Sequence, residues 1–146
     1  MRIGVFTVLY QSEPLADVLD GLAALGVEAV EIGVGGHPGS AHCDVEGLLA
    51  DPARALAFGS AVKERGMVIS ALSQHGNPVH PDPEVAGRDH AVWLRALRLA
   101  EVLEVPVVNA FSGCPGDGPD GRRPNWVTCR GRTSSPRSSS GSGASV

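Results

Sequence analysis

Four short apolar runs recur along this chain, at residues 3–9, 29–34, 68–72 and 105–111. Nearly continuous apolar, β-branched runs of this length are typical of strands buried on both faces, as in parallel sheets. Each of the first three runs is followed by a polar segment and then by a stretch with helical periodicity. Strands that alternate with helices predict βαβ units and a parallel sheet. The expected fold class is therefore α/β.

The stretches between these runs carry the end signals of helices. Ser12 can cap the first helix, and Gly26 can end it. The second helix is expected over residues 52–65, with Asp44 or Asp51 as the cap. The third is expected over residues 84–103, with one apolar stripe made of Ala86, His90, Trp93, Leu97 and Ala100.

Right-handed crossovers would place all the strand-to-helix loops at one end of the sheet. Such loops carry chemistry in α/β proteins because the strands fix their bases. The strongest example is residues 70–81, where a strand turns into a proline-stiffened loop with the sequence Ser-Ala-Leu-Ser-Gln-His-Gly-Asn-Pro-Val-His-Pro. One neighbourhood is therefore expected to collect Glu31, His37, His42, His75, Asn77, His80, Asn109 and Ser112.

Charge and composition exclude several partners. The formal net charge is −4, and three of the twelve Lys and Arg residues lie in residues 130–146, which hold no acidic residue. The acidic main body argues against a nucleic-acid partner, which needs a basic face. No apolar run approaches the roughly 20 residues of a membrane span. The N-terminus lacks signal-peptide features, and the three cysteines show no C-x-x-C spacing, so a cytoplasmic location is expected.

The chain changes character near its end. Residues 130–146 are rich in Arg, Ser and Gly and hold no large apolar side chain, so this segment is expected to be disordered. Two explanations are open. The segment is either a basic tail or a frame-shifted translation of a GC-rich gene. We favour the frame shift, because the tail begins soon after the fourth strand and no helix covers that strand.

Several stretches together resemble the sugar phosphate isomerase/epimerase family, the xylose-isomerase-like TIM barrels related to the AP endonuclease family 2 fold. The residues that carry this resemblance lie within residues 1–129. They are Ile3-Gly-Val-Phe-Thr-Val, Ala24-Leu-Gly-Val-Glu-Ala-Val-Glu-Ile-Gly, Gly36-His-Pro-Gly-Ser-Ala-His-Cys-Asp, Ile69-Ser-Ala-Leu-Ser-Gln-His-Gly-Asn-Pro-Val-His-Pro-Asp, Phe111-Ser-Gly-Cys-Pro-Gly and Pro124-Asn-Trp-Val-Thr-Cys.

The resemblance implies that residues 1–129 supply about the first four of the eight units of a TIM barrel. It also implies metal-assisted proton transfer between adjacent carbons of a sugar or sugar phosphate, with Mn, Co, Mg or Zn as the divalent ion. In such enzymes carboxylates and a histidine of the later strands hold the metal, and carboxylates there move the protons. This chain lacks those strands, so no catalytic residue and no bound metal are expected for it alone.

Two residues are the sharpest substrate-binding candidates. His75 stands at a strand end and aligns with a metal-ligand histidine of the endonuclease branch. We favour a substrate contact, with a metal role and a structural role as alternatives. Glu31 lies inside an apolar strand, where a carboxylate has to be paired, metal-bound or protonated. It is expected either to bind a sugar hydroxyl inside the barrel or to pair with an arginine such as Arg2.

Three further residues complete the candidate site. Asn77 is expected mainly to form an Asx-type turn with its own backbone, with substrate contact as the alternative. His80 is either a substrate contact or a brace of its loop. Trp126 either lines the sugar site or covers the barrel mouth.

Two alternatives of other classes stay open. The chain could be a non-catalytic half-barrel that binds a partner or itself through the exposed edges of its first and fourth strands. It could also be a metal-dependent phosphodiesterase of the endonuclease type, although no histidine follows the fourth strand, where a second ligand would be needed.

Overall fold

The chain folds into one four-stranded parallel sheet covered by helices. The computed structural model describes residues 1–116, 118 and 120–125. All neighbouring strands are parallel, and their order in the sheet is β1-β2-β3-β4. The α/β prediction is therefore confirmed. In chain order the elements are β1 (Gly4–Phe6), a short 3₁₀ helix η1 (Thr7–Tyr10), α1 (Leu15–Ala24), β2 (Ala29–Gly36), α2 (Val45–Ala50), α3 (Pro52–Lys63), β3 (Val68–His75), α4 (Pro83–Val102) and β4 (Val108–Ala110).

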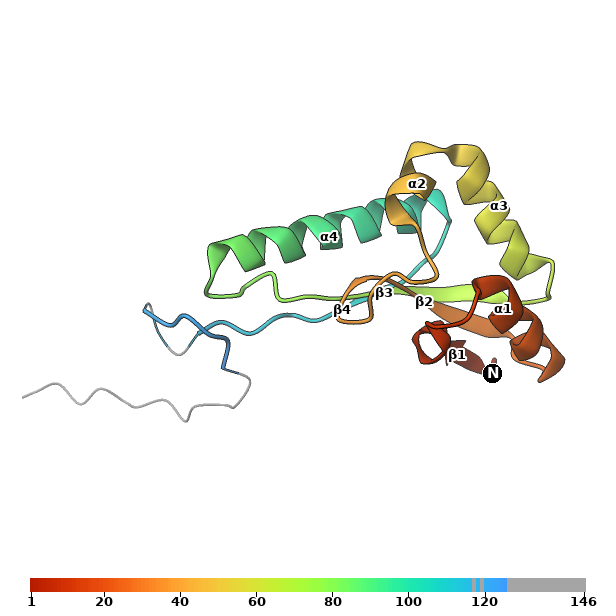
Figure 1. The fold of residues 1–146 in the computed structure, drawn as a ribbon, viewed down its shortest axis with the longest axis horizontal. Coiled ribbons are helices and arrows are strands. Elements are labelled where there is room, and N and C mark those ends of the chain that lie inside the picture. The colour runs from red at the N-terminus through yellow and green to blue at the C-terminus, as the bar shows by residue number, and fades with distance from the viewer. Residues whose placement is uncertain (117, 119, 126–146) are drawn as a thin grey trace, which may run out of the picture.

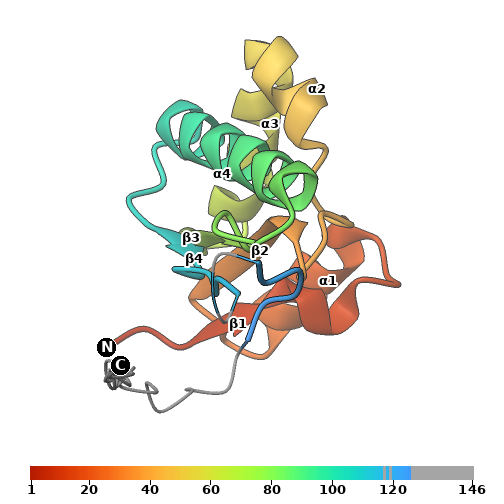
Figure 2. The ribbon, with the colours of Figure 1, turned by 90° about the vertical axis from the view of Figure 1, so that its left-hand side faces the viewer.

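The longest helix, α4, lies along the sheet and packs on β2, β3 and β4 (Figure 1). Helices α2 and α3 pack against each other near one end of α4, and α1 lies beside β1 and β2 (Figure 2). The core lies between these helices and one face of the sheet. Its most deeply buried side chains are Leu19, Val30, Ile32, Val62, Met67, Leu72 and Leu99.

The two outer strands are shorter than the sequence predicts. Residues 3–9 were expected as one doubly buried strand, but only Gly4–Phe6 is a strand, and Thr7–Tyr10 forms the 3₁₀ helix. Likewise, only Val108–Ala110 of residues 105–111 is a strand. Each outer strand has one strand neighbour in the described part of the chain, so apolar sequence there does not imply burial. Ile3, for example, is 64% exposed.

Helix ends follow the sequence signals with one exception. Ser12 does not cap α1, because Pro14 occupies the N-cap position and no side chain accepts a hydrogen bond there. Gly26 does follow the end of α1, with φ +75° as a left-handed C′ residue requires.

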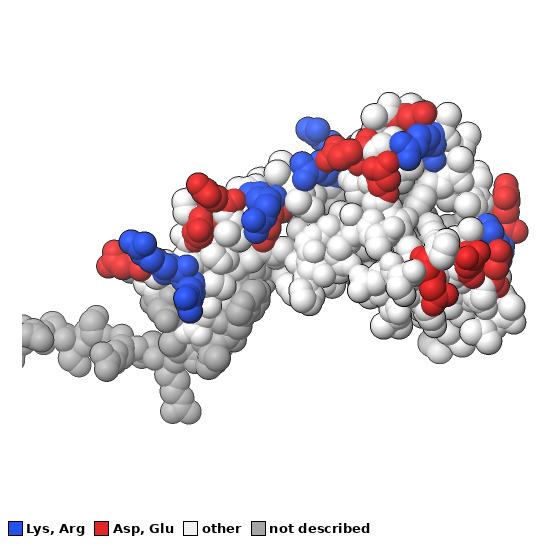
Figure 3. All heavy atoms as spheres, viewed as in Figure 1, with Lys and Arg blue, Asp and Glu red and all other residues white. Residues whose placement is uncertain are grey.

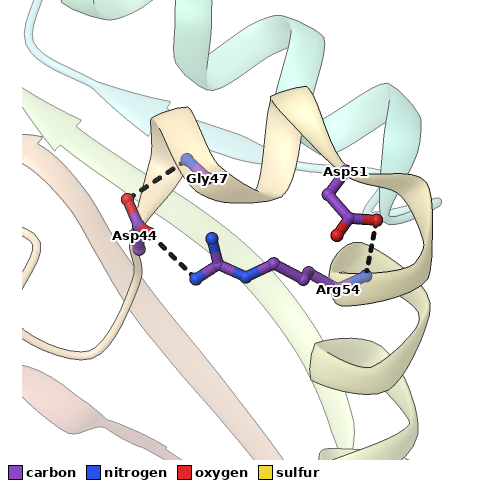
Figure 4. A network of polar contacts seen from close by, with 4 residues as sticks. All are labelled: Asp44, Gly47, Asp51 and Arg54. Atoms are coloured by element: carbon purple, nitrogen blue, oxygen red, sulfur yellow. Dashed lines mark hydrogen bonds and ion pairs between the residues drawn. The ribbon is translucent and has the colours of Figure 1, made fainter.

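Of the two aspartates considered as the cap of one predicted helix, Asp51 caps that helix, α3, whereas Asp44 caps α2, a short helix that the sequence analysis did not predict (Figure 4). Asp44 accepts a hydrogen bond from the backbone N–H of Gly47 at the start of α2 and pairs with Arg54 at 2.9 Å. The Gly47 N–H, and then the Arg54 guanidinium, lower the pKa of Asp44 below its ordinary value. Asp51 accepts from the N–H groups of Ala53 and Arg54 at the start of α3. Asp44 therefore links the start of α2 to the first turn of α3, and Asp51 caps α3 itself.

Asp51→Ala is expected to lower the free energy of unfolding by about 1 kcal/mol, because two N–H groups at the start of α3 lose their acceptor. Asp51→Ser keeps an oxygen at the cap, so it should lower the free energy of unfolding by only a few tenths of a kcal/mol. Urea unfolding followed by circular dichroism measures both. Equal losses for the two variants would show that an oxygen acceptor at residue 51 does not account for the loss.

The face of α4 that packs on the sheet differs from the predicted stripe. Ala96, Leu99 and Ala100 are buried, whereas His90 and Leu97 are exposed. The packed stripe thus runs about one residue earlier along the helix than the prediction. The prediction counted His90 as an apolar position, and this shifted the stripe toward the solvent side.

Charged side chains lie mainly over the helices. Figure 3 shows Asp, Glu, Lys and Arg along the upper and right-hand edges of the molecule, while the middle of this face is largely uncharged. No helix in the described part of the chain is long and apolar enough to cross a membrane.

Candidate functional site at the open face of the sheet

One face of the sheet is not packed against the helices, and polar side chains project from it. Side chains alternate between the two faces of a strand. On β2, Val30, Ile32 and Val34 belong to the core beneath the helices, so Glu31 between them points to the opposite, open face. The burial of Leu72 in the same core likewise directs Ser73 of β3 to the open face.

Glu31 is the centre of a polar cluster that joins three strands. Its Oε1 accepts hydrogen bonds from the Ser73 hydroxyl of β3 and, at 2.9 Å, from the Nδ2 of Asn109 on β4. We call Glu31, Ser73 and Asn109 the Glu31 cluster. Within the described residues, Glu31 forms no ion pair, and Arg2 lies at the other end of the sheet. The expected alternative of an Arg2–Glu31 pair is therefore wrong.

The hydrogen bonds from Ser73 and Asn109 to the Glu31 carboxylate both reach the same oxygen, Oε1. No described residue donates to the other oxygen, Oε2. Glu31 is half-buried and Ser73 is fully buried, so the Ser73 hydroxyl holds the carboxylate from a fixed position, while Asn109 donates from an exposed one. A fixed carboxylate with a free oxygen can accept hydrogen bonds from a ligand's hydroxyl groups.

His75 lies at the end of β3 in a group of aromatic rings. It stacks on Phe111, with ring centroids 4.4 Å apart and an interplanar angle of 9°. Phe6 of β1 approaches the same imidazole edge-on, with centroids 6.5 Å apart. Phe111 is 49% exposed. His75 belongs to no group of three or more His, Cys, Asp or Glu side chains that could hold a metal ion among the described residues.

Asn77 ties the loop after β3 to the segment after β4. Its Nδ2 donates to the Cys114 carbonyl and its Oδ1 accepts from the Cys114 N–H, both at 2.8 Å. The backbone N–H of Asn77 donates to Asp89 of α4 at 2.7 Å. The expected Asx-type turn is therefore wrong, because the side-chain amide of Asn77 bonds the backbone of Cys114 and not its own backbone.

His80 acts within its own loop. The ring Nδ1 of His80 accepts a hydrogen bond from the backbone N–H of Asp82, and the backbone N–H of His80 donates to the Asn77 carbonyl. These contacts are those of a loop brace, which was one of the two interpretations of this histidine. Trp126, the remaining candidate, lies outside the described residues, as does the predicted disordered tail at residues 130–146.

The neighbourhood expected from the sequence is only partly assembled. Glu31 and Asn109 meet directly, and His37 reaches the His75 carbonyl through its backbone N–H. His42 instead contacts the Glu13 carbonyl through Nε2. The sequence reasoning missed Ser73 and the two phenylalanines. Ser73 could have been found as a polar residue inside an apolar strand, two positions before His75.

The described residues do not form a metal site or an activated thiol. They contain no group of three or more His, Cys, Asp or Glu side chains that could hold a metal ion. The divalent ion implied by the resemblance therefore has no set of ligands in this part of the chain. Burial, and to a lesser degree the neighbouring Asp44, raises the pKa of the Cys43 thiol to about 12, so this cysteine is not a thiolate nucleophile.

A large cavity lies at the opposite end of the sheet from these residues. It has a volume of about 580 Å³ and is lined by Arg2, Gly4, Ala29, Lys63 and Glu104, among others. These residues stand at the amino ends of the strands, whereas parallel α/β folds place their chemistry at the carboxyl ends. We therefore locate the candidate site at the Glu31 cluster and the His75–Phe111 stack.

Comparison with known proteins identifies the family to which this fold belongs. The family model of the xylose isomerase-like TIM barrel matches residues 19–133. The chain is 34% identical over 129 residues to YfiH of Bacillus subtilis (strain 168), an uncharacterized protein, and this match covers 88% of the chain and 41% of YfiH.

Solved structures of similar fold include two D-psicose 3-epimerases. One was determined in the presence of D-fructose, with a TM-score of 0.53 at 14% identity over 75% of this chain and 37% of that one. The other, from Clostridium cellulolyticum H10 with D-tagatose, has a TM-score of 0.54 at 16% identity over the same shares. This chain spans about two fifths of the length of the proteins it matches. By its fold and its family match, it belongs to the xylose isomerase-like TIM barrel family.

Proposed function

We propose that this chain supplies a sugar-binding part of a sugar isomerase or epimerase, with the Glu31 cluster holding the sugar's hydroxyl groups. The observation that carries the proposal is the geometry of the Glu31 carboxylate. Ser73 and Asn109 hold Oε1, which leaves Oε2 without a donor from the described residues on the open face of the sheet. Two neighbouring hydroxyls of a sugar are donors that suit such an oxygen.

The aromatic stack supplies the second element of a sugar site. A sugar ring has faces of C–H groups that pack on aromatic rings, and its edges carry hydroxyls. Phe111 and His75 form a flat, partly exposed surface, and the Glu31 cluster projects from the same face of the sheet. A sugar would therefore meet an apolar surface and a hydrogen-bond acceptor together.

The reaction we infer is the transfer of a proton between adjacent carbons of the sugar, which interconverts isomers or epimers. Such a reaction needs an acid–base pair and, in the related family, a divalent metal that polarises the sugar's oxygens. The described residues offer no cluster of metal ligands. Their role in the proposal is to bind and orient the sugar.

A ketose without a phosphate group is the first ligand to test. The hydrogen bonds and ion pairs of the described residues bring no Lys or Arg to the Glu31 cluster, and a neutral sugar needs no such partner. The D-fructose and D-tagatose named for the two epimerase structures support the choice of ketose.

Glu31→Gln is expected to weaken binding of D-fructose or D-tagatose at least about tenfold, because a charged acceptor contributes about 1.5–3 kcal/mol to a hydrogen bond. Titrations of the 146-residue chain followed by NMR chemical shifts measure the dissociation constant. D-fructose 6-phosphate, titrated in parallel, compares the sugar with its phosphate.

Glu84→Gln is the matched control for this substitution. It removes an exposed carboxylate in the first turn of α4, outside the Glu31 cluster, and should leave sugar binding unchanged. The proposal fails if the unsubstituted chain shows no saturable shifts with either ketose, or if Glu31→Gln and Glu84→Gln behave alike.

A further inference from the structure

The chain turns back on itself at the end of β2. The Gly39 N–H donates to the Gly36 carbonyl at 3.1 Å, which closes a turn over residues 36–39. The Gly39 carbonyl accepts a hydrogen bond from the Gly35 N–H at 2.9 Å, and this bond ties the turn to β2. Pro38, in the middle of the turn, is buried. We call residues 36–39 the Gly36 turn.

The Gly36 turn meets the sheet at Gly33. Gly33 is the register partner of Ser73, and cross-strand partners share a face of the sheet. Its two neighbours along β2 belong to the core beneath the helices, so Gly33 faces the open side, as Glu31 does. A Cβ on Gly33 would lie 2.9 Å from the Gly39 carbonyl oxygen and 3.3 Å from the Cβ of Pro38. The turn therefore occupies the space that a side chain at residue 33 would need.

The burial of Ser73 agrees with a cover at this point. Ser73 projects from the face that the helices do not reach, yet it is 0% exposed, and its partner Gly33 is buried too. Glu31 lies two residues before Gly33 on the same face, which is about 6.5 Å along the strand. The hydrogen bond from the Ser73 hydroxyl to Glu31 thus lies beside the turn and is shielded from water on that side.

We propose that the Gly36 turn is one wall of the sugar site and that Gly33 is the positioning residue that sets this wall. The inference rests on the proposed sugar-binding role of the Glu31 cluster. A ketose held by the Glu31 carboxylate meets the backbone of the turn at the carboxyl end of β2. The turn limits the room for the ligand there, and it keeps water from competing for the carboxylate oxygen that Ser73 holds.

Gly33→Ala isolates the steric part of this role. Unlike Gly36 and Gly39, Gly33 does not have a positive φ, so alanine suits its backbone. The 2.9 Å from the new Cβ to the Gly39 oxygen is well inside the roughly 3.5–4.0 Å of an ordinary van der Waals contact. Because that oxygen belongs to the backbone, the whole turn has to move. The same oxygen accepts from the Gly35 N–H, so this hydrogen bond should weaken.

The experiment is an NMR titration of the 146-residue chain with D-fructose and with D-tagatose. The amide signals of His37 and Gly39 should shift saturably, with the same dissociation constant as the signal of Ser73. Gly33→Ala should raise this dissociation constant about threefold to tenfold, because the carboxylate becomes open to water. Without sugar, the same variant should show faster hydrogen exchange of the Gly35 amide.

Pro38→Gly tests the wall without changing the sheet. It removes the fixed φ of proline and its contact with Gly33, so it should accelerate exchange of the Gly35 amide and weaken ketose binding as well. Gly21→Ala is the control, because Gly21 is exposed on α1 and has open space where a Cβ would stand. It should leave both measurements unchanged.

The outcomes separate this inference from the sugar-binding proposal. If the unsubstituted chain binds neither ketose, the sugar-binding proposal fails and the wall fails with it. If it binds a ketose but the His37 and Gly39 signals do not move, the wall alone is overturned. The wall is also overturned if Gly33→Ala and Pro38→Gly bind the ketose as tightly as Gly21→Ala does.

Discussion

Asn77→Ala is expected to lower the free energy of unfolding by about 2–4 kcal/mol. Asn77 is 7% exposed, and its side chain forms two hydrogen bonds with the backbone of Cys114. Removing the amide leaves one N–H and one carbonyl without partners in a buried position, and each unsatisfied group costs about 1–3 kcal/mol. Urea unfolding of the purified chain measures the loss.

The same substitution should also disturb the candidate site. Asn77 follows His75 by two residues, and Cys114 follows Phe111 by three, so the clamp fixes the loops that begin at the stacked rings. Without the hydrogen bonds between Asn77 and Cys114, the two rings should separate. The ring-current contribution of Phe111 to the His75 proton shifts should then shrink. An NMR comparison of the two proteins detects this change.

Val79→Ala is the control for Asn77→Ala. It shortens a side chain that is 45% exposed in the same loop, and it should cost less than about 0.5 kcal/mol. If the two variants unfold at the same urea concentration, the bonds between Asn77 and Cys114 do not stabilise the protein.

The sequence predicts the strands and helices well where the apolar pattern is set by local packing. Strand β2 and helix α3 lie within a few residues of their predicted bounds, because a short continuous apolar run marks a buried strand and a period-3.6 pattern follows directly from helix geometry. The outer strands are less predictable, because burial of Ile3 or Val107 depends on what lies beside the sheet. An apolar run alone carries no information about a neighbour.

The candidate site is predictable in part for a similar reason. A carboxylate in an apolar strand identifies Glu31 from the sequence alone, since a buried charge needs partners. Its partners depend on register, and β2 and β3 shift their register between Val30 and Glu31 and again between Gly33 and Gly35. No local pattern reveals such irregularities, so Ser73 and Asn109 could not be assigned to Glu31.

Asn77 also shows that local sequence preferences do not predict long-range contacts. Asparagine after a strand most often bonds its own backbone, and this preference led to the Asx-turn prediction. Here the better partner, Cys114, stands 37 residues away and is brought near by the pairing of β3 with β4. The long-range contact overrides the local preference.

Gly36→Ala is expected to lower the free energy of unfolding by about 2–4 kcal/mol and to displace His75. Gly36 has φ +67°, a left-handed conformation that costs a residue with a Cβ about 1–2 kcal/mol. A Cβ there would also lie 2.6 Å from the His75 carbonyl oxygen and 2.7 Å from its carbon. These are backbone atoms, so β2 and β3 would have to separate at this point.

Gly39→Ala distinguishes the two causes, because Gly39 shares the left-handed conformation at φ +69° but has open space where its Cβ would stand. It should cost only the conformational part, about 1–2 kcal/mol. The excess loss of Gly36→Ala over Gly39→Ala therefore measures the close approach of the two strands.

That approach also allows the His37 N–H to donate to the His75 carbonyl at 2.9 Å. Hydrogen exchange of the His37 amide should accelerate in Gly36→Ala and not in Gly39→Ala. Equal stability losses and equal exchange rates would show that the strands are not held together at His75, and the position of its imidazole beside Phe111 would then need another cause.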